Sequence, residues 1–214
     1  MSVGDMWKSI AATRLVLVVL NVALFALGPT PWMVLGLLCL AGAMAMTFWR
    51  GRDFGHHACA LLETARRAQD PESPAHGQLD HTVLSRTWSV ARGLKGVLAS
   101  SLVSYVVGCL YIVCSLLNVG PLVLPTRLVS WLLATPYWPV VLHWYDTFDR
   151  LTGVVAAVLM ISPFVLPLCL FAGYMQGPKL WARSEKAMAE GKRRAKAKSR
   201  INRRKAPKAP KPEI

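Results

Sequence analysis

Acidic side chains are scarce in this sequence, and charge of either sign is almost missing from four long stretches. The chain has 214 residues with 11 Asp and Glu against 25 Lys and Arg, yet 54% of its residues are hydrophobic. Stretches 15–27, 32–49, 97–117 and 151–175 carry almost no charge. Apolar and basic residues are separated in this way in membrane proteins, whereas a soluble domain mixes them. The separation predicts an all-α integral membrane protein.

Cysteine and histidine spacings typical of metal or redox sites are also missing. There are 5 cysteines, an odd number, and no CxxC pair occurs. This pattern excludes the disulfide framework of a small secreted protein and predicts thiols that only pack. The histidines His56, His57, His76 and His81 cluster in the segment 50–95, but no HxxxH or HExxH spacing is present. We therefore expect no metal site and no cofactor.

A bundle of four transmembrane helices is predicted, with spans at about 10–28, 32–49, 97–117 and 151–175. A span needs about 20 apolar residues because the hydrocarbon core is about 30 Å thick and a helix rises about 1.5 Å per residue. The first span reaches this length only if Arg14 lies near the inner interface, where its side chain can snorkel.

Two details refine these spans. Gly28 and Pro29 predict a tight turn, so that the first two spans form an antiparallel hairpin. A basic start followed by a short apolar core also resembles a signal peptide, but a proline after Gly28 disfavours cleavage. In the fourth span, Pro163 and Pro167 predict a kink whose freed carbonyl groups are satisfied by neighbours.

The distribution of basic residues decides the orientation. The N-terminal segment has two basic residues (Lys8 and Arg14), seven Lys or Arg lie in 50–95 and fourteen follow residue 177, whereas the outer segment 118–150 has only two. The positive-inside rule then places both termini in the cytoplasm of a cell-membrane protein. Residues 119–142 are apolar enough to form a fifth span, but their four prolines argue against it. A fifth span would also separate the basic loop from the basic tail.

The cytoplasmic segment 50–95 is predicted to form a helical hairpin. Its first helix continues from the second span, although Gly51 and Gly55 make a break at the inner interface an alternative. Asp80 or Thr82 is the expected cap of the second helix, which includes Trp88 on its apolar side.

The outer segment 118–150 is rich in aromatic residues and is predicted to be interfacial or re-entrant. Thr126 is the expected cap of a short helix that runs to about Thr135. Tryptophans and tyrosines that follow are expected at the level of the lipid headgroups.

Candidate chemistry is limited to one cluster near the fourth span. His143, Asp146 and Asp149 are weak catalytic candidates, because a histidine and two carboxylates can relay protons or hold a cation. We favour the simpler interpretation that they cap or solubilise the start of the span. No Asp, Glu, Lys or His falls near a span centre, which argues against a self-sufficient transporter.

The third span carries a row of small residues at Gly96, Ser100, Ser104 and Gly108. A four-residue spacing places them along one ridge of the helix, where a second helix can approach closely. This helix-packing face serves either the bundle itself or a partner subunit, and use within the bundle is the default expectation.

The tail, residues 178–214, is predicted to begin as a helix and to end as an extended, unfolded chain. Anionic phospholipid attracts such a segment by about 1 kcal/mol per basic residue, and ribosomal or other RNA or an acidic protein offers similar attraction. No aromatic residue follows Trp181, so neither base stacking nor sequence-specific DNA recognition is expected. The basic binding residues are Lys192, Arg193, Arg194, Lys196, Lys198, Arg200, Arg203, Arg204 and Lys205.

These patterns together favour a non-enzymatic docking or accessory protein. The bundle, residues 1–177, would offer its helix faces to a membrane protein partner, and the tail would act at the cytoplasmic surface. One alternative is a subunit of a transporter or of a membrane-protein insertion system. Another is a membrane-embedded lipid-modifying enzyme that uses His143 with Asp146 or Asp149.

Overall fold

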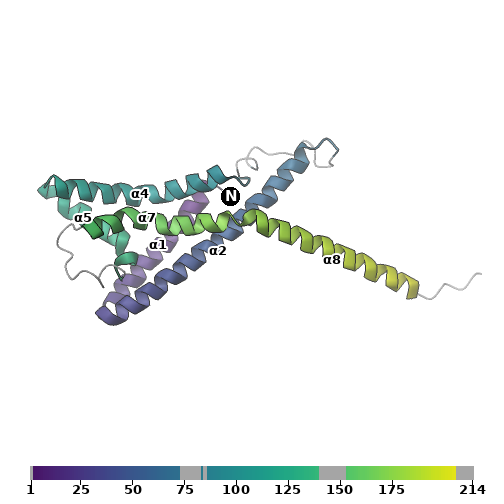
Figure 1. Cartoon of the computed structure of the whole chain (residues 1–214), viewed down its shortest axis with the longest axis horizontal. Coiled ribbons are helices and arrows are strands. Elements are labelled where there is room, and N and C mark those ends of the chain that lie inside the picture. Colours follow the sequence, from purple (N-terminus) through teal and green to yellow (C-terminus); the bar gives the residue numbers. More distant parts are fainter. Residues whose placement is uncertain (1, 73–82, 84–85, 140–152, 206–214) are drawn as a thin grey trace, which may run out of the picture.

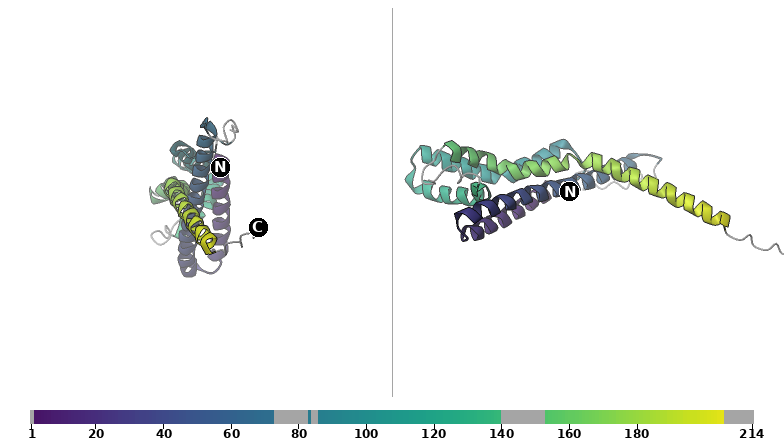
Figure 2. Two further views of the ribbon diagram at one scale, coloured as in Figure 1. Left: turned by 90° about the vertical axis from the view of Figure 1, so that its right-hand side faces the viewer. Right: turned by 60° about the horizontal axis from the view of Figure 1, so that its bottom comes forward.

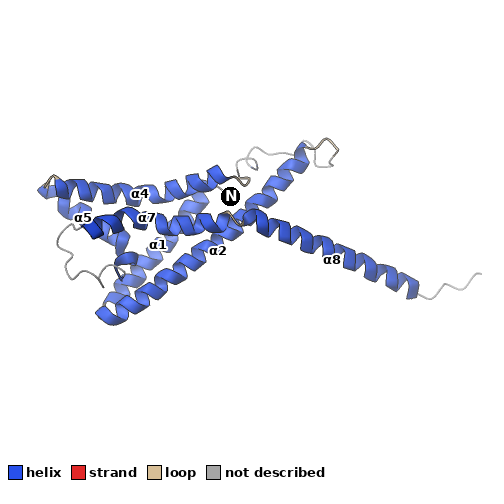
Figure 3. Cartoon of the chain, in the orientation of Figure 1, coloured by secondary structure: helices blue, strands red, loops and turns tan. Residues whose placement is uncertain are grey.

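The computed structural model of the chain describes residues 2–72, 83, 86–139 and 153–205 (Figure 1). Every regular element in these ranges is a helix, as Figure 3 shows. The elements are α1 (Val3–Phe25), α2 (Pro29–Gln69), α4 (Val90–Leu116), α5 (Gly120–Ala134), the 3₁₀ turn η1 (Thr135–Tyr137), α7 (Gly153–Tyr174) and α8 (Gly177–Lys205). Four helices, namely α1, α2, α4 and α7 with its continuation, are long and apolar enough to cross a membrane. The predicted all-helical protein with four apolar helices is therefore confirmed.

Helices α1 and α2 form a hairpin whose ends are set by local sequence. The hydroxyl of Ser2 accepts from the Asp5 amide at 3.2 Å, and the Asp5 carboxylate accepts from the Ser2 amide at 2.8 Å. This reciprocal capping box satisfies two amides at the start of α1. Gly28 turns the chain with a φ of +99°, which side chains with a Cβ rarely adopt, and Pro29 then begins α2.

Helix α2 continues for 41 residues without a break at Gly51 or Gly55. The returning arm differs from the prediction, because residues 86–89 are not helical and Ser89 caps α4 instead. The Trp88 amide donates to the carbonyl of Ala58 at 3.0 Å, which holds this segment across α2. The expected caps Asp80 and Thr82 lie outside the described residues.

The chain reverses direction between α4 and α5 at Asn118, which has a φ of 51°. The Val119 amide donates to the Cys114 carbonyl at 3.0 Å, the closing bond of a Schellman turn. Helix α5 then runs back along α4, and the Ser130 hydroxyl donates to the Val107 carbonyl at 3.2 Å. The last turn of α5 is thereby brought level with the middle of α4.

The prediction that Thr126 caps the outer helix is wrong. Helix α5 already begins at Gly120, and Thr126 lies inside it with its hydroxyl donating to the Leu122 carbonyl at 2.6 Å. A proline in the first turn needs no amide partner, so Pro121 provides the start that the sequence analysis assigned to Thr126.

Three apolar clusters follow one another along the bundle. Near the α1–α2 turn lie Trp32, Tyr111, Ala134, Trp138, Val155 and Leu159. The middle cluster contains Leu17, Leu40, Ala43, Tyr137 and Leu166, and the cluster at the other end contains Met6, Ile10, Ala58, Leu170 and Tyr174. The N-terminus and the start of α8 therefore share one end of the bundle (Figure 1). From that end α8 extends away from the other helices, as Figure 1 and the right view of Figure 2 show.

Candidate functional site

An arginine lies halfway along α1 and points into the bundle. Arg14 Nη1 donates to the Ser100 carbonyl at 3.1 Å and to the Ser104 hydroxyl at 2.7 Å, and Nη2 donates to the Pro163 carbonyl. These acceptors lie near the midpoints of α4 and α7. Polar acceptors on two neighbouring helices therefore hold the guanidinium, and these partners were not predicted from the sequence.

The acceptor on α7 exists because of Pro167. In a regular helix the Pro163 carbonyl would accept from the amide of residue 167, but Pro167 has none. That carbonyl accepts instead from Arg14 and from the Ser101 hydroxyl, the latter at 3.0 Å. The sequence predicts that neighbouring residues satisfy the carbonyl groups freed by the prolines. For the Pro163 carbonyl these neighbours are Arg14 and Ser101.

No carboxylate among the described residues pairs with Arg14. The one ion pair found in that part of the chain joins Arg67 and Glu63 at 3.2 Å on the projecting end of α2. A small cavity beside the guanidinium, about 10 Å³, is also lined by Leu133 and Ala134 at the carboxyl end of α5. A helix carboxyl end carries a partial negative charge, so α5 directs its dipole favourably at the arginine.

Arg14 also lines a groove of about 240 Å³ between α1, α4 and the end of α5. Two residues of its rim, Leu15 and Val103, are 67% and 59% exposed. An apolar rim of this kind suits contact with lipid chains. A cation inside a membrane bundle is costly, and such residues usually mark a functional site.

The predicted packing face on α4 is directed at other helices of the same chain. A side chain at Gly96 would approach the Met6 sulfur at 2.5 Å, and one at Gly108 would lie 3.4 Å from the Leu159 carbonyl. Between them, Ser100 and Ser104 supply acceptors to Arg14. The row of small residues therefore lets α1 and α7 approach α4 and also provides polar groups for the arginine.

A second set of small residues escaped the sequence analysis. Gly51 and Gly55 on α2 meet Gly173 and Gly177 at the α7–α8 junction, with backbone against backbone. A methyl group at Gly51 would overlap the Leu170 carbonyl oxygen. The four-residue spacing of both glycine pairs was the available signal, and it is typical of close helix crossings in membranes.

No protein-family model, curated protein or solved structure matches the chain.

Two groups of predicted residues remain, one near the start of α7 in the sequence and one in α8. The weak catalytic candidates His143, Asp146 and Asp149 lie outside the described residues. In α8, the basic side chains Lys192, Arg193, Arg194, Lys196 and Lys198 are exposed. Arg200, Arg203, Arg204 and Lys205 continue the same helix.

Helix α8 is attached to the bundle only near its start. His56 lies 5.3 Å from the Trp181 ring, and its Nε2 is 3.2 Å from the Ser184 hydroxyl. Beyond these contacts the described side chains of α8 are exposed. The basic residues are therefore presented away from the bundle on a single helix.

Proposed function

We propose that the chain is a four-spanning, non-enzymatic membrane protein that docks an anionic macromolecule through α8. Both termini are cytoplasmic in this proposal, in agreement with the basic residues that follow α7 and precede α1. The supporting observation is the direction of α8, which leaves the bundle as an exposed basic helix rather than folding back on it (Figures 1 and 2).

The distance from the bundle argues for a macromolecular partner over the lipid surface. Helix α8 begins at Gly177, and the basic run starts at Lys192. At about 1.5 Å per residue, this run begins roughly 20 Å along the helix. Electrostatic attraction in physiological salt decays over about 8 Å, so headgroups at the base of the helix attract these charges weakly. A partner that reaches the helix itself, such as RNA or an acidic protein, is attracted at full strength.

The proposal is tested by neutralising the basic run. Lys192, Arg193, Arg194, Lys196 and Lys198 are replaced together by Gln, and co-purifying proteins, RNA and lipids are compared with those of the unchanged protein. A matched control replaces Lys179, Arg183 and Lys186 at the base of α8 by Gln. We expect the first variant alone to lose a protein or RNA, with binding that weakens steeply as salt rises. Loss of anionic phospholipid alone would contradict docking and leave α8 as a lipid anchor.

The Arg14 groove supports a second candidate, a subunit of a transporter or of a membrane-protein insertion system. A cation in a groove with an apolar rim attracts an anionic group that enters the bundle from the bilayer. The two candidates respond differently to two changes. Docking requires the tail, so truncation after Gly177 abolishes it and Arg14→Leu leaves it intact. A transport or insertion role shows the opposite pattern in a growth assay of cells that depend on the protein.

A further inference from the structure

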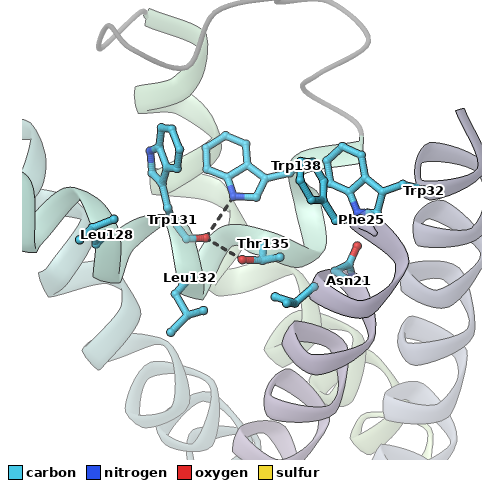
Figure 4. A pocket seen from close by; sticks show the side chains of 9 residues that line it. Asn21, Phe25, Trp32, Leu128, Trp131, Leu132, Thr135 and Trp138 are labelled. Carbon is cyan, nitrogen blue, oxygen red and sulfur yellow. Dashed lines mark hydrogen bonds between the residues drawn. The ribbon is translucent and has the colours of Figure 1, made fainter. Parts of the chain in front are cut away.

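A cavity of about 380 Å³ lies between α1, the first turns of α2 and the α5–η1 segment (Figure 4). Aromatic side chains dominate its walls, namely Phe25, Trp32, Trp131 and Trp138. Small-molecule sites in proteins have volumes of about 300–1,000 Å³, so this one lies at the lower end of that range. It has room for one lipid chain with its linking group, rather than for a whole two-chain lipid.

Two polar groups on the α5–η1 side of the cavity are hydrogen-bonded to the same backbone carbonyl. The Trp138 indole nitrogen donates to the Trp131 carbonyl at 3.0 Å, and the Thr135 hydroxyl donates to the same carbonyl at 2.9 Å. Figure 4 draws both bonds as dashed lines. The Trp138 nitrogen, the Thr135 hydroxyl and the Trp131 carbonyl therefore need no bond from a ligand.

The α1–α2 side is different, because one acceptor and one donor buried in this wall have no hydrogen-bond partner among the described residues. Asn21 is 0% exposed, and its Nδ2 donates to the Leu17 carbonyl at 2.9 Å, which fixes the orientation of the amide. Its Oδ1 has no partner among the described residues, and neither has the indole nitrogen of Trp32, which is 4% exposed. Leaving such groups unpaired is unfavourable, so a ligand that bonds both is strongly preferred.

The mouth of the cavity is apolar. Val22, Phe25, Leu128 and Leu132 line it and are 57%, 64%, 58% and 51% exposed, respectively. A ligand that crosses such a rim comes from the hydrocarbon phase rather than from water. It is therefore an amphiphile that carries a long apolar chain.

The two unpaired atoms restrict the head of that amphiphile. Ester and ether oxygens only accept hydrogen bonds, and an ammonium group only donates them. A cationic head is further disfavoured, because the Arg127 guanidinium already lies 4.6 Å from the centre of the Trp131 ring. A hydroxyl group donates and accepts at once, and it can serve the Asn21 oxygen and the Trp32 nitrogen together.

We propose that this cavity binds a neutral, single-chain lipid with a hydroxyl head, of the monoacylglycerol or fatty-alcohol type. The hydroxyl donates to Asn21 Oδ1 and accepts from Trp32 Nε1, while the chain leaves through the apolar rim. This site is independent of α8, so the docking proposal and the lipid proposal can fail separately.

The direct test uses the full chain in nanodiscs of phosphatidylcholine, a lipid without hydrogen-bond donors. Dodecan-1-ol bearing a diazirine in its chain is photo-crosslinked to the protein, and the labelled peptides are mapped by mass spectrometry. Unlabelled dodecan-1-ol and dodecyl methyl ether then compete with the probe. They have similar chains, but the ether oxygen cannot donate. We expect labelling on α1, α2 and α5, and competition by the alcohol about tenfold stronger than by the ether, the ratio that corresponds to one hydrogen bond.

Two variants assign the polar contacts. Asn21→Leu removes the acceptor and should weaken binding of the alcohol about tenfold without weakening that of the ether, which has no proton to donate. Trp32→Phe removes the donor, from which both oxygens can accept, and should weaken binding of the alcohol and of the ether about equally. Trp49→Phe, at an indole that is 62% exposed and does not line the cavity, is the matched control. Asn21→Leu should remain at least as heat-stable as the unchanged protein, because it removes a buried oxygen that lacks a partner. Trp32→Phe removes an unpaired donor but leaves a small void in the core, so its heat stability should be similar or slightly lower.

Three results would overturn the proposal. Equal competition by alcohol and ether would mean that water, not the ligand, bonds these atoms. Labelling confined to other helices would place the ligand elsewhere. Unchanged alcohol binding in both variants would remove Asn21 and Trp32 from the site. If a variant fails to fold, the competition of alcohol and ether for the unchanged protein still tests the proposal.

Discussion

Arg14 donates hydrogen bonds only to neutral acceptors in the described part of the chain. A contribution to the stability of the folded bundle therefore does not explain why an arginine is present at this position. Three hydrogen bonds, to Ser100, Ser104 and Pro163, offset part of the cost of burying its charge. A buried charge that lacks a counter-charge is otherwise unfavourable, and apolar replacements of buried charges are often neutral or stabilising. We therefore expect Arg14 to serve a function, because burying its charge does not stabilise the bundle.

This view predicts an unusual order of stabilities. Arg14→Leu should be as stable as the unchanged protein or more so, because it removes the charge. Arg14→Lys should be less stable by about 1–3 kcal/mol, because an ammonium keeps the charge but cannot span acceptors on both α4 and α7. Thermal unfolding in detergent measures both.

The control for this series is Arg67→Leu, in an exposed ion pair with Glu63. Surface pairs contribute about 0–1 kcal/mol, so little change is expected. If Arg14→Leu unfolded as readily as Arg14→Lys or more readily, the arginine would be a structural residue of the bundle.

At the scale of elements, the crossing of α2 with the α7–α8 junction depends on residues without side chains. A methyl group at Gly51 would overlap the Leu170 carbonyl oxygen, and one at Gly173 would overlap the Phe48 carbonyl oxygen. The two backbones touch, and neither helix has a flexible side chain there that can move aside. The crossing fixes where α8 leaves the bundle.

Alanine at this crossing should therefore be damaging. Gly173→Ala is expected to destabilise the bundle by about 1–3 kcal/mol or more, since the clash forces the two helices apart. Gly42→Ala, on α2 with nothing within 4 Å of the added carbon, is the matched control. It should be neutral or slightly stabilising, because alanine favours a helix by about 0.5–1 kcal/mol over glycine. Equal unfolding midpoints for the two variants would contradict the observed crossing.

Hydropathy was sufficient to predict the four apolar helices, because length and apolar composition are local properties. The direction of the Arg14 side chain was not predictable in the same way. It depends on acceptors that α4 and α7 supply, and one of these exists only because Pro167 lacks an amide. The non-helical turn at Trp88 likewise results from a bond to Ala58, far away in the sequence. The four-residue spacing of the glycine pairs is visible in the sequence, but the sequence does not show that the pair on α2 packs against the pair at the α7–α8 junction.

For the whole molecule, the central expectation is a common side for the basic segments. Ser199→Cys in a cysteine-free background should resist an impermeant thiol reagent in intact cells, because α8 is cytoplasmic in the proposed topology. Asn118→Cys, at the α4–α5 turn on the opposite end of the bundle, should be labelled. Gel-shift detection of the modified protein measures both positions. Labelling at residue 199 would overturn the four-span topology and the docking proposal with it.

The length of α2 has a further consequence. Its 41 residues correspond to roughly 60 Å of helix, whereas the hydrocarbon core of a bilayer is about 30 Å thick. In the proposed topology, about half of α2 extends beyond the hydrocarbon layer, and α8 leaves the bundle at the same glycine crossing. Beyond the crossing, α2 and α8 point away from each other (Figure 1). In the proposed docking, a partner that contacts the ends of both helices would therefore be held away from the bilayer surface.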